Sequence, residues 1–144
     1  MDRFLPDSPG SSIFAACLPA MDATTPLLLS QVDSALVQRW FEELRDDVRI
    51  VLAEVLNNIV EHGYPPRSVG AVAINMHATN AVLTINVRDW GRAYACQTLP
   101  RGSSPNPTDL AEGGYGWFLI RALVSELAYE RAEGMNRLTL AFGL

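Results

Sequence analysis

The segment EVLNNIVEHGY, residues 54–64, most restricts the folds available to this chain. Each residue of an α-helix advances by about 100° around the axis, so positions four apart fall on the same side. Glu54, Asn58 and His62 would therefore form a polar ridge, while the aliphatic residues between them face a core. Gly63 and the proline pair that follows are expected to end the helix. The sequence thus predicts a helix with one side in the core and one polar side.

Two side chains of this ridge have an evident chemical use. The carboxylate of Glu54 can accept a proton, and the amide oxygen of Asn58, one turn further on, can ligate a hard cation such as Mg²⁺. The neighbouring Glu61 is either solvated or a competing base. The alternative interpretation is a solvated helix face, because polar ridges are common on surface helices.

Composition excludes several classes of protein. The 144 residues are 49% hydrophobic and 19% charged, which indicates one globular domain with a real core. The net charge is −5, which argues against a nucleic-acid surface. All 11 basic residues are arginine, so a lysine-based phosphate clamp is excluded. No apolar run reaches the ~18 residues that a membrane span needs. The two cysteines lack metal-like spacing, and we expect reduced thiols in a cytoplasmic protein.

The first half of the chain predicts one strand and two helices. After a loose tail at residues 1–11, residues 12–18 form a short apolar run typical of a strand. Apolar residues then recur every four positions across residues 26–44, which predicts a helix with Thr25 as its N-cap. A second helix is expected to start at Asp46, where carboxylates favour the positive end of the helix dipole, and to carry the ridge.

The second half predicts two hairpins around one more helix. The expected elements, in chain order, are strands at residues 69–78 and 81–89, a helix at 117–127, and strands at 127–130 and 137–142 joined by a Glu133–Gly134 turn. Residues 90–114 lack periodicity and are rich in proline and glycine, which is typical of a functional or mobile loop. The order predicts an α+β fold: a two-layer α/β sandwich with helices on one face of a mostly antiparallel mixed sheet, formed by a single domain at residues 12–144.

Two further motifs flank the long loop. Asp89 and Gly91 follow a predicted strand, where a buried carboxylate could accept a hydrogen bond from an exocyclic amine such as that of adenine. A plain turn is the alternative. Glycines at 113, 114 and 116 precede a helix, and free backbone N–H groups at such a turn suit phosphate. The alternative is a flexible loop end.

The three motifs, taken together and in this order, resemble those of the Bergerat-fold (GHKL) ATPases, and most closely those of the small bacterial anti-sigma factor serine kinases. The matching segments are EVLNNIVEHGY at residues 54–64, DWGRA at residues 89–93 and GYG at residues 114–116. The resemblance covers residues 12–142. In the second motif Ala93 stands where the family has a glycine.

The resemblance implies specific roles. Asn58 would ligate Mg²⁺ on the ATP phosphates, and Glu54 would act as general base toward a serine hydroxyl of a protein substrate. A lid at residues 92–113 would close over the nucleotide. Arg101 is the first candidate for the arginine that meets the γ-phosphate, and Arg92 is the second candidate. The nucleotide contacts implied in this way are Asn58, His62, Asp89, Gly91, Arg101, Gly114, Tyr115 and Gly116.

These roles lead to competing functional hypotheses. The first is an ATP-dependent protein serine kinase and anti-sigma factor, which binds a sigma factor and phosphorylates a STAS-like antagonist protein in a partner-switching pathway. The second is a non-catalytic, ATP-gated binding module, which the alanine at position 93 favours. A histidine-kinase catalytic domain is a weaker third hypothesis, since no helix with a phosphoacceptor histidine precedes the fold. A homodimer is implied by the resemblance alone, and neither nucleic acid nor membrane is an expected partner.

Overall fold

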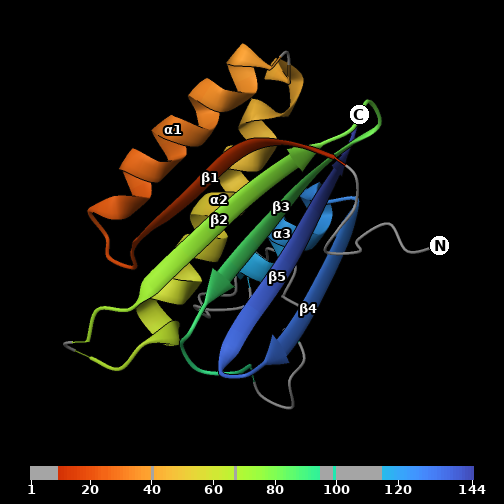
Figure 1. The fold of residues 1–144 in the computed structure, drawn as a ribbon. Helices are drawn as coiled ribbons and strands as arrows, with labels where there is room; N and C mark the ends of the chain where they lie inside the picture. The colour runs from red at the N-terminus through yellow and green to blue at the C-terminus, as the bar shows by residue number, and fades with distance from the viewer. Residues whose placement is uncertain (1–9, 40, 67, 95–98, 100–114) are drawn as a thin grey trace, which may run out of the picture.

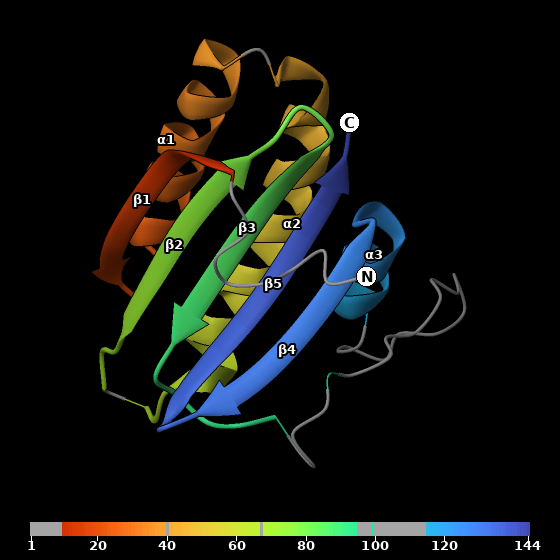
Figure 2. The same ribbon diagram turned by 45° about the vertical axis from the view of Figure 1, so that its right-hand side comes forward.

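The fold is a five-stranded sheet with helices packed on one of its faces, as Figures 1 and 2 show. The computed structural model describes residues 10–39, 41–66, 68–94, 99 and 115–144. The strand order is β1-β2-β3-β5-β4, and each of the four pairings is antiparallel. The elements are β1 (Ser11–Pro19), α1 (Thr24–Gln38), η1 (Glu42–Leu44), α2 (Arg45–Asn58), η2 (Ile59–Gly63), β2 (Ala71–Ala78), β3 (Val82–Asp89), α3 (Tyr115–Leu123), β4 (Glu126–Ala132) and β5 (Met135–Gly143). The predicted α+β sandwich is confirmed.

The core lies between the sheet and the helices. Alternate residues of the central strands point toward the helices, because side chains of a strand alternate between its two faces. Each such buried aliphatic side chain stabilises the fold by about 1.5–3 kcal/mol. Strand and helix residues that are at most 2% exposed in this core include Val72, Ile74, Met76, Leu83, Ile85, Val87, Val48, Val51, Leu52 and Val55. The apolar side predicted for the ridge helix therefore does face the core.

The two predicted hairpins are present and differ from expectation only at their ends. β2 and β3 are joined around Thr79, whose hydroxyl accepts hydrogen bonds from the amides of Ala81 and Val82 at 3.2 and 3.1 Å. β4 and β5 are joined by Glu133 and Gly134, both with positive φ (53° and 78°). Two consecutive residues of positive φ match the type I′ turn, whose twist suits a tight hairpin.

The first helix is shorter than predicted. α1 ends at Gln38 instead of residue 44, because the chain turns there and the amides of Arg39 and Phe41 both donate to the carbonyl oxygen of Leu36, at 3.3 and 2.9 Å. Phe41 and Leu44 still pack against the core after the break, and Leu44 continues the four-residue series of Leu28, Val32 and Leu36 where the helix does not. The prediction of Thr25 as N-cap is also wrong, since the helix begins at Thr24 after Ala23.

The ridge helix changes geometry at its end. α2 ends at Asn58, and residues Ile59–Gly63 continue it as one π-helical turn, so the expectation of a regular helix through His62 is wrong in its last turn. A π-turn inserts an extra residue per turn and is common at functional sites. Ile59 is 4% exposed within this turn and keeps it attached to the core.

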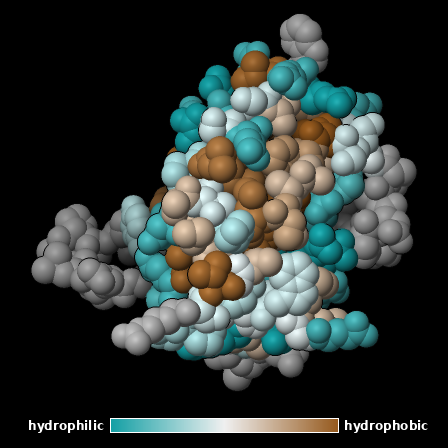
Figure 3. Space-filling view, turned by 60° about the vertical axis from the view of Figure 1, so that its left-hand side comes forward, coloured by the Kyte–Doolittle hydropathy of each residue, from teal (hydrophilic) through white to brown (hydrophobic). Residues whose placement is uncertain are grey.

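The surface of α1 is only partly covered. Viewed from the side on which α1 lies, hydrophobic side chains gather in the middle of the molecule (Figure 3). On α1 itself, Leu27 is 54% and Val37 is 38% exposed. Within the described part of the chain, no helix is long and apolar enough to cross a membrane.

Candidate active site

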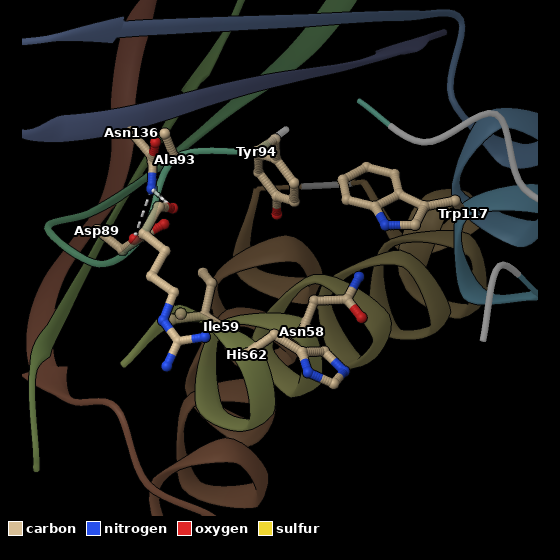
Figure 4. Close-up of a pocket in the computed structure, with 10 residues that line it drawn as sticks. Asn58, Ile59, His62, Asp89, Ala93, Tyr94, Trp117 and Asn136 are labelled. Carbon is tan, nitrogen blue, oxygen red and sulfur yellow. Dashed lines mark hydrogen bonds between the residues drawn. The ribbon is translucent and has the colours of Figure 1, made fainter. Parts of the chain in front are cut away.

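A cavity of about 280 Å³ opens where the end of α2, the π-turn, the end of β3 and the start of α3 meet (Figure 4). Two of the three sequence motifs contribute side chains to it, although they lie about thirty residues apart in the chain. The described residues that line it are Asn58, Ile59, His62, Gly63, Asp89, Arg92, Ala93, Tyr94, Trp117 and Asn136. The structure thus brings Asn58, His62 and Asp89 together in one cavity.

Asp89 forms the deep end of the cavity. It is the last residue of β3 and is 5% exposed. Its Oδ1 atom accepts hydrogen bonds from the amide of Gly91 at 2.9 Å and from Nδ2 of Asn136 at 3.0 Å. Among the described residues, none donates to Oδ2. Asp89 therefore keeps its second oxygen available for a ligand in the cavity, while Oδ1 fixes the orientation of the carboxylate.

Asn136 is a site residue that the sequence reasoning did not single out. It lies opposite Asp89 in the register of β3 and β5 and is 3% exposed. Its Oδ1 accepts from the hydroxyl of Tyr129 at 2.7 Å and from Nη1 of Arg131 at 2.9 Å. Its Nδ2 also donates to the carbonyl oxygen of Arg92 at 2.7 Å. Because Oδ1 of Asn136 already accepts from two donors, it is the Nδ2 amino group that faces Asp89.

Asn58 stands on the opposite wall of the cavity. Its Nδ2 is buried and has no hydrogen-bond partner among the described residues. Leaving a buried polar atom unpaired costs about 1–3 kcal/mol, so such an atom in a cavity indicates a missing ligand. Rotation of the carboxamide brings Oδ1 to the same place, where it can ligate a cation such as Mg²⁺. The donor set at Asn58 therefore fits the predicted metal.

His62 also lines the cavity but differs from Asn58 in environment. Its side chain is 75% exposed, and its Nε2 lies 3.6 Å from Oε2 of Glu61, which is itself 65% exposed. Figure 4 shows both Asn58 and His62 on the helical wall, facing Tyr94 and Trp117 across the cavity. His62 is thus at the solvent rim of the site.

Comparison with known proteins identifies the family. Residues 18–142 match the family model of the histidine kinase-like ATPase domain. The chain belongs to the histidine kinase-like ATPase family. The predicted recognition is confirmed, and the named relatives place the chain with the serine-protein kinases of this family.

One relative is the serine/threonine-protein kinase BtrW of Bordetella bronchiseptica, 34% identical over 107 residues, which are 74% of this chain and 75% of that protein. Another is the serine-protein kinase RsbW of Halalkalibacterium halodurans, 28% identical over 95 residues, 62% of this chain and 57% of that protein. A crystal structure of RsbU and RsbW domains from Mycobacterium tuberculosis shares the fold at a TM-score of 0.56 and 19% identity, covering 90% of this chain and 32% of that one.

In this histidine kinase-like ATPase domain, Glu54 lies outside the cavity lining but touches α3. A Cβ atom placed on Gly116, in the first turn of α3, would overlap Oε2 of Glu54 and come within 3.3 Å of its Cδ. The glycine therefore leaves the space that the end of the carboxylate occupies. Tyr115, the first residue of α3, is 44% exposed and is not among the lining residues.

Gly91 serves the site through the backbone. It does not line the cavity, and a Cβ at Gly91 would overlap the carbonyl oxygen of Gly63. The same oxygen accepts a hydrogen bond from the amide of Arg92 at 2.7 Å. The second motif is thus joined directly to the π-turn that ends the first motif.

Tyr64 makes a second connection between these motifs. Its hydroxyl donates to the carbonyl oxygen of Ala71 at 2.6 Å and accepts from the amide of Trp90 at 2.9 Å. Burial raises the pKa of Tyr64, which keeps the phenol protonated and able to donate. The start of β2 and the end of β3 are therefore tied to the same side chain.

Three aromatic rings support one side of the cavity. Tyr94 meets Trp117 edge to face at 5.5 Å between centroids, and meets Tyr129 in the same way at 5.0 Å. Burial raises the pKa of Tyr94, so this phenol stays neutral. Edge-to-face packing stabilises such pairs beyond the area they bury. The result is an apolar wall in the cavity that Asp89 also lines.

The remaining predicted contacts are outside the described residues. Arg101, Gly114 and most of the predicted lid at 92–113 belong to this group. At the start of that segment, Arg92 and Ala93 are exposed and line the cavity. Of the two cysteines, Cys17 is an exposed free thiol and Cys96 is outside the described residues.

Proposed function

We propose that the chain is an ATP-dependent serine-protein kinase that also acts as an anti-sigma factor. The observation that carries this proposal is that two polar groups line one cavity with capacity for a ligand: Oδ2 of Asp89, to which no described residue donates, and the carboxamide of Asn58, whose buried Nδ2 has no described partner. The Asp89 oxygen is an acceptor suited to the adenine amine. The other is suited to a cation on the phosphates. A nucleotide bound in the cavity would contact both groups.

Adenine recognition would use Asp89 and the aromatic wall. The adenine amine donates to Oδ2, while the bonds of Gly91 and Asn136 to Oδ1 hold the carboxylate in place. Trp117 and Tyr94 cover the base on its apolar side. A base lacking the exocyclic amine would leave Oδ2 unpaired, and a site built on one such hydrogen bond discriminates strongly against analogues that lack it.

Phosphoryl transfer would then require positioning and charge neutralisation more than covalent help. Bound Mg²⁺ would neutralise charge on the phosphates. Asn58 would hold that cation, and Glu54 would accept the proton of the substrate serine as its Oγ forms a bond to the γ-phosphorus and the bond to the ADP oxygen breaks. Arg101 and Gly114 would contact the phosphates from the lid, and Tyr115 and Gly116 would begin the helix behind it.

The partners we propose follow from the relatives. Relatives of this chain bear the name serine-protein kinase RsbW. We infer that the substrate is a STAS-like anti-sigma antagonist, that the second partner is a sigma factor, and that the protein works as a cytoplasmic homodimer. A single domain at residues 12–144 with a lid near 92–113 would carry these activities, without contact to nucleic acid or membrane.

A second function has one observation in its favour. Ala93 stands in the second motif in place of a glycine, at the edge of the cavity where the lid segment begins. An added methyl group there would restrict the backbone of the lid. The protein would then hold ATP and switch partners without transferring phosphate.

The test measures binding and transfer separately. Calorimetry of ATP with Mg²⁺ should show binding by the wild type and a more than tenfold loss in Asn58→Ala and Asp89→Asn, since each removes an interaction with a charged group worth about 1.5–3 kcal/mol. Radiolabelled ATP is then mixed with each STAS-like protein of the source organism. Labelling by wild type but not by Glu54→Ala supports the kinase; ATP binding without labelling of any of them supports the gated module. Absence of ATP binding refutes both.

A further inference from the structure

The sheet face turned away from the helices carries a second polar hollow. This face is the one that looks toward the reader in Figure 1. The hollow has a volume of about 260 Å³ and lies over the second half of β2, the end of β3 and the start of β5. We call it the basic hollow; its lining residues are Asn75, His77, Asn86, Arg88, Met135 and Arg137. It is separated from the ATP site by the sheet, since Asp89 and Asn136 point to the opposite face from Arg88 and Arg137.

Two arginines of the basic hollow face each other without adequate counter-charge. Arg88 and Arg137 are direct partners in the register of β3 and β5, and like charges in that position destabilise a sheet. Arg88 has one hydrogen bond, from Nη2 to Oδ1 of Asn75 at 3.4 Å, and no carboxylate partner in the described ranges. Arg137 is 21% exposed and lies 3.7 Å from Oε1 of Glu130, which is 64% exposed. The hollow therefore carries an excess of positive charge.

This arrangement contrasts with arginines elsewhere in the chain. Arg45 and Arg49 share the carboxylate of Asp33 at 2.8 and 3.1 Å. The chain as a whole has 16 acidic and 11 basic residues, so carboxylates are plentiful. The opposed arginine pair shares one carboxylate among the described residues, the exposed Glu130 at 3.7 Å from Arg137, and is thus less closely paired than Arg45 and Arg49 on the helices.

The neutral residues of the basic hollow add further donors. Oδ1 of Asn75 already accepts from Arg88, and Oδ1 of Asn86 accepts from the hydroxyl of Thr139 at 3.0 Å. Both amide oxygens therefore have a donor, and no described residue accepts from either amide nitrogen. Two guanidinium groups and two amide nitrogens form a set of donors that suits an oxyanion.

We propose that the basic hollow binds carboxylate side chains from an acidic segment of a partner protein. Arginine binds carboxylates through two parallel hydrogen bonds, which fits a pair of guanidinium groups on an open surface. A nucleic acid is disfavoured by the net charge of −5. A second copy of this chain, placed face to face over the hollow, would set one arginine pair against another. The proposal does not depend on catalysis, because the hollow and the ATP site lie on opposite faces.

The experiment uses thermal unfolding of the full chain, with a capped peptide of glutamate residues as the probe. Sodium chloride at matched ionic strength measures plain screening of the arginine pair. The variants are Arg88→Gln and Arg137→Gln, and Arg39→Gln is the control because it removes the same charge from an exposed position at the end of α1. Asp89→Asn reports whether the peptide occupies the ATP site instead.

We expect the peptide to raise the Tm of wild type, Arg39→Gln and Asp89→Asn, and to leave the Tm of Arg88→Gln and Arg137→Gln unchanged. Without peptide, Arg88→Gln should unfold at the wild-type temperature or above it, because the like-charge pair is gone. An equal rise with sodium chloride, or a peptide effect that survives both hollow variants, overturns the proposal. A rise in Tm with inorganic phosphate but not with the peptide also overturns it, since the occupant would then be a small anion. A dimer in light scattering that Arg88→Gln abolishes overturns it as well, since the occupant would then be a second copy of the chain.

Discussion

Replacing Gly116 with alanine tests the role of Glu54 without touching its chemistry. The new methyl group would overlap Oε2 and lie 3.3 Å from Cδ, whereas Cβ of Glu54 is at 3.8 Å, an ordinary contact. Only the end of a flexible side chain has to move, so the fold should tolerate the change. Alanine in place of glycine within a helix should even stabilise α3 by up to about 1 kcal/mol.

The catalytic cost follows from the displacement. Moving a reacting group by about 1 Å can lower a rate by on the order of 10²-fold, and loss of a general base costs about 10²–10⁴-fold. We therefore expect phosphotransfer to the antagonist to fall by about 10²-fold in Gly116→Ala, with ATP affinity unchanged in calorimetry. The double variant Gly116→Ala/Glu54→Asp should lose less than the two single losses combined, since the shorter carboxylate avoids the methyl group.

Two outcomes would refute this reasoning. If Gly116→Ala transfers phosphate at the wild-type rate, then either Glu54 is not the base or its position does not depend on α3. If ATP binding falls along with transfer, the glycine acts on the nucleotide and not through Glu54. A lower Tm in Gly116→Ala would mean that α3 has moved instead of the Glu54 side chain.

Three further predictions concern the cavity, the contact between Gly91 and Gly63, and the ion pair between Asp33 and Arg45. Asn136→Ala should lower both stability and ATP affinity, since Asp89 loses a hydrogen bond worth about 1.5–3 kcal/mol; urea unfolding and calorimetry measure the two effects. Gly91→Ala should cost about 1–3 kcal/mol in urea unfolding, because its methyl group would push the chain off the carbonyl oxygen of Gly63; an unchanged midpoint would contradict the contact. Arg45 lowers the pKa of Asp33, so the stability from this pair is present above the unfolded pKa of about 3.9 and is lost as pH falls through the folded value. Asp33→Asn should therefore lose less stability than wild type when Tm is followed from about pH 5 to pH 2.

Local periodicity was sufficient to predict most of the fold. The hairpins were found because alternation over eight residues is a strong signal, and the ridge of α2 because its apolar residues repeat with the helix period. The end of α1 was missed because Leu44 keeps the four-residue spacing after the helix has stopped. The π-turn was missed because five residues are too few to separate its period from that of an α-helix.

The site was predicted where its residues lie in compact motifs and missed where it depends on strand pairing. Asp89 was found from its place at a strand end. Asn136 lies 47 residues further along the chain and faces Asp89 only through the register of β3 and β5. A search for polar residues at the core-facing end of a strand that pairs with the Asp89 strand would have found it.

The contacts between motifs explain why the three sequence motifs occur together. The π-turn of the first motif accepts a hydrogen bond from Arg92 of the second through the carbonyl oxygen of Gly63. The first helix turn of the third motif lies against Glu54 of the first, and only a glycine at position 116 leaves room for the carboxylate. A change in one motif therefore acts on the geometry of another. Since Ala93 lies two residues beyond Gly91, its effect should appear in the lid and not in the position of Asp89, which is fixed independently by Asn136.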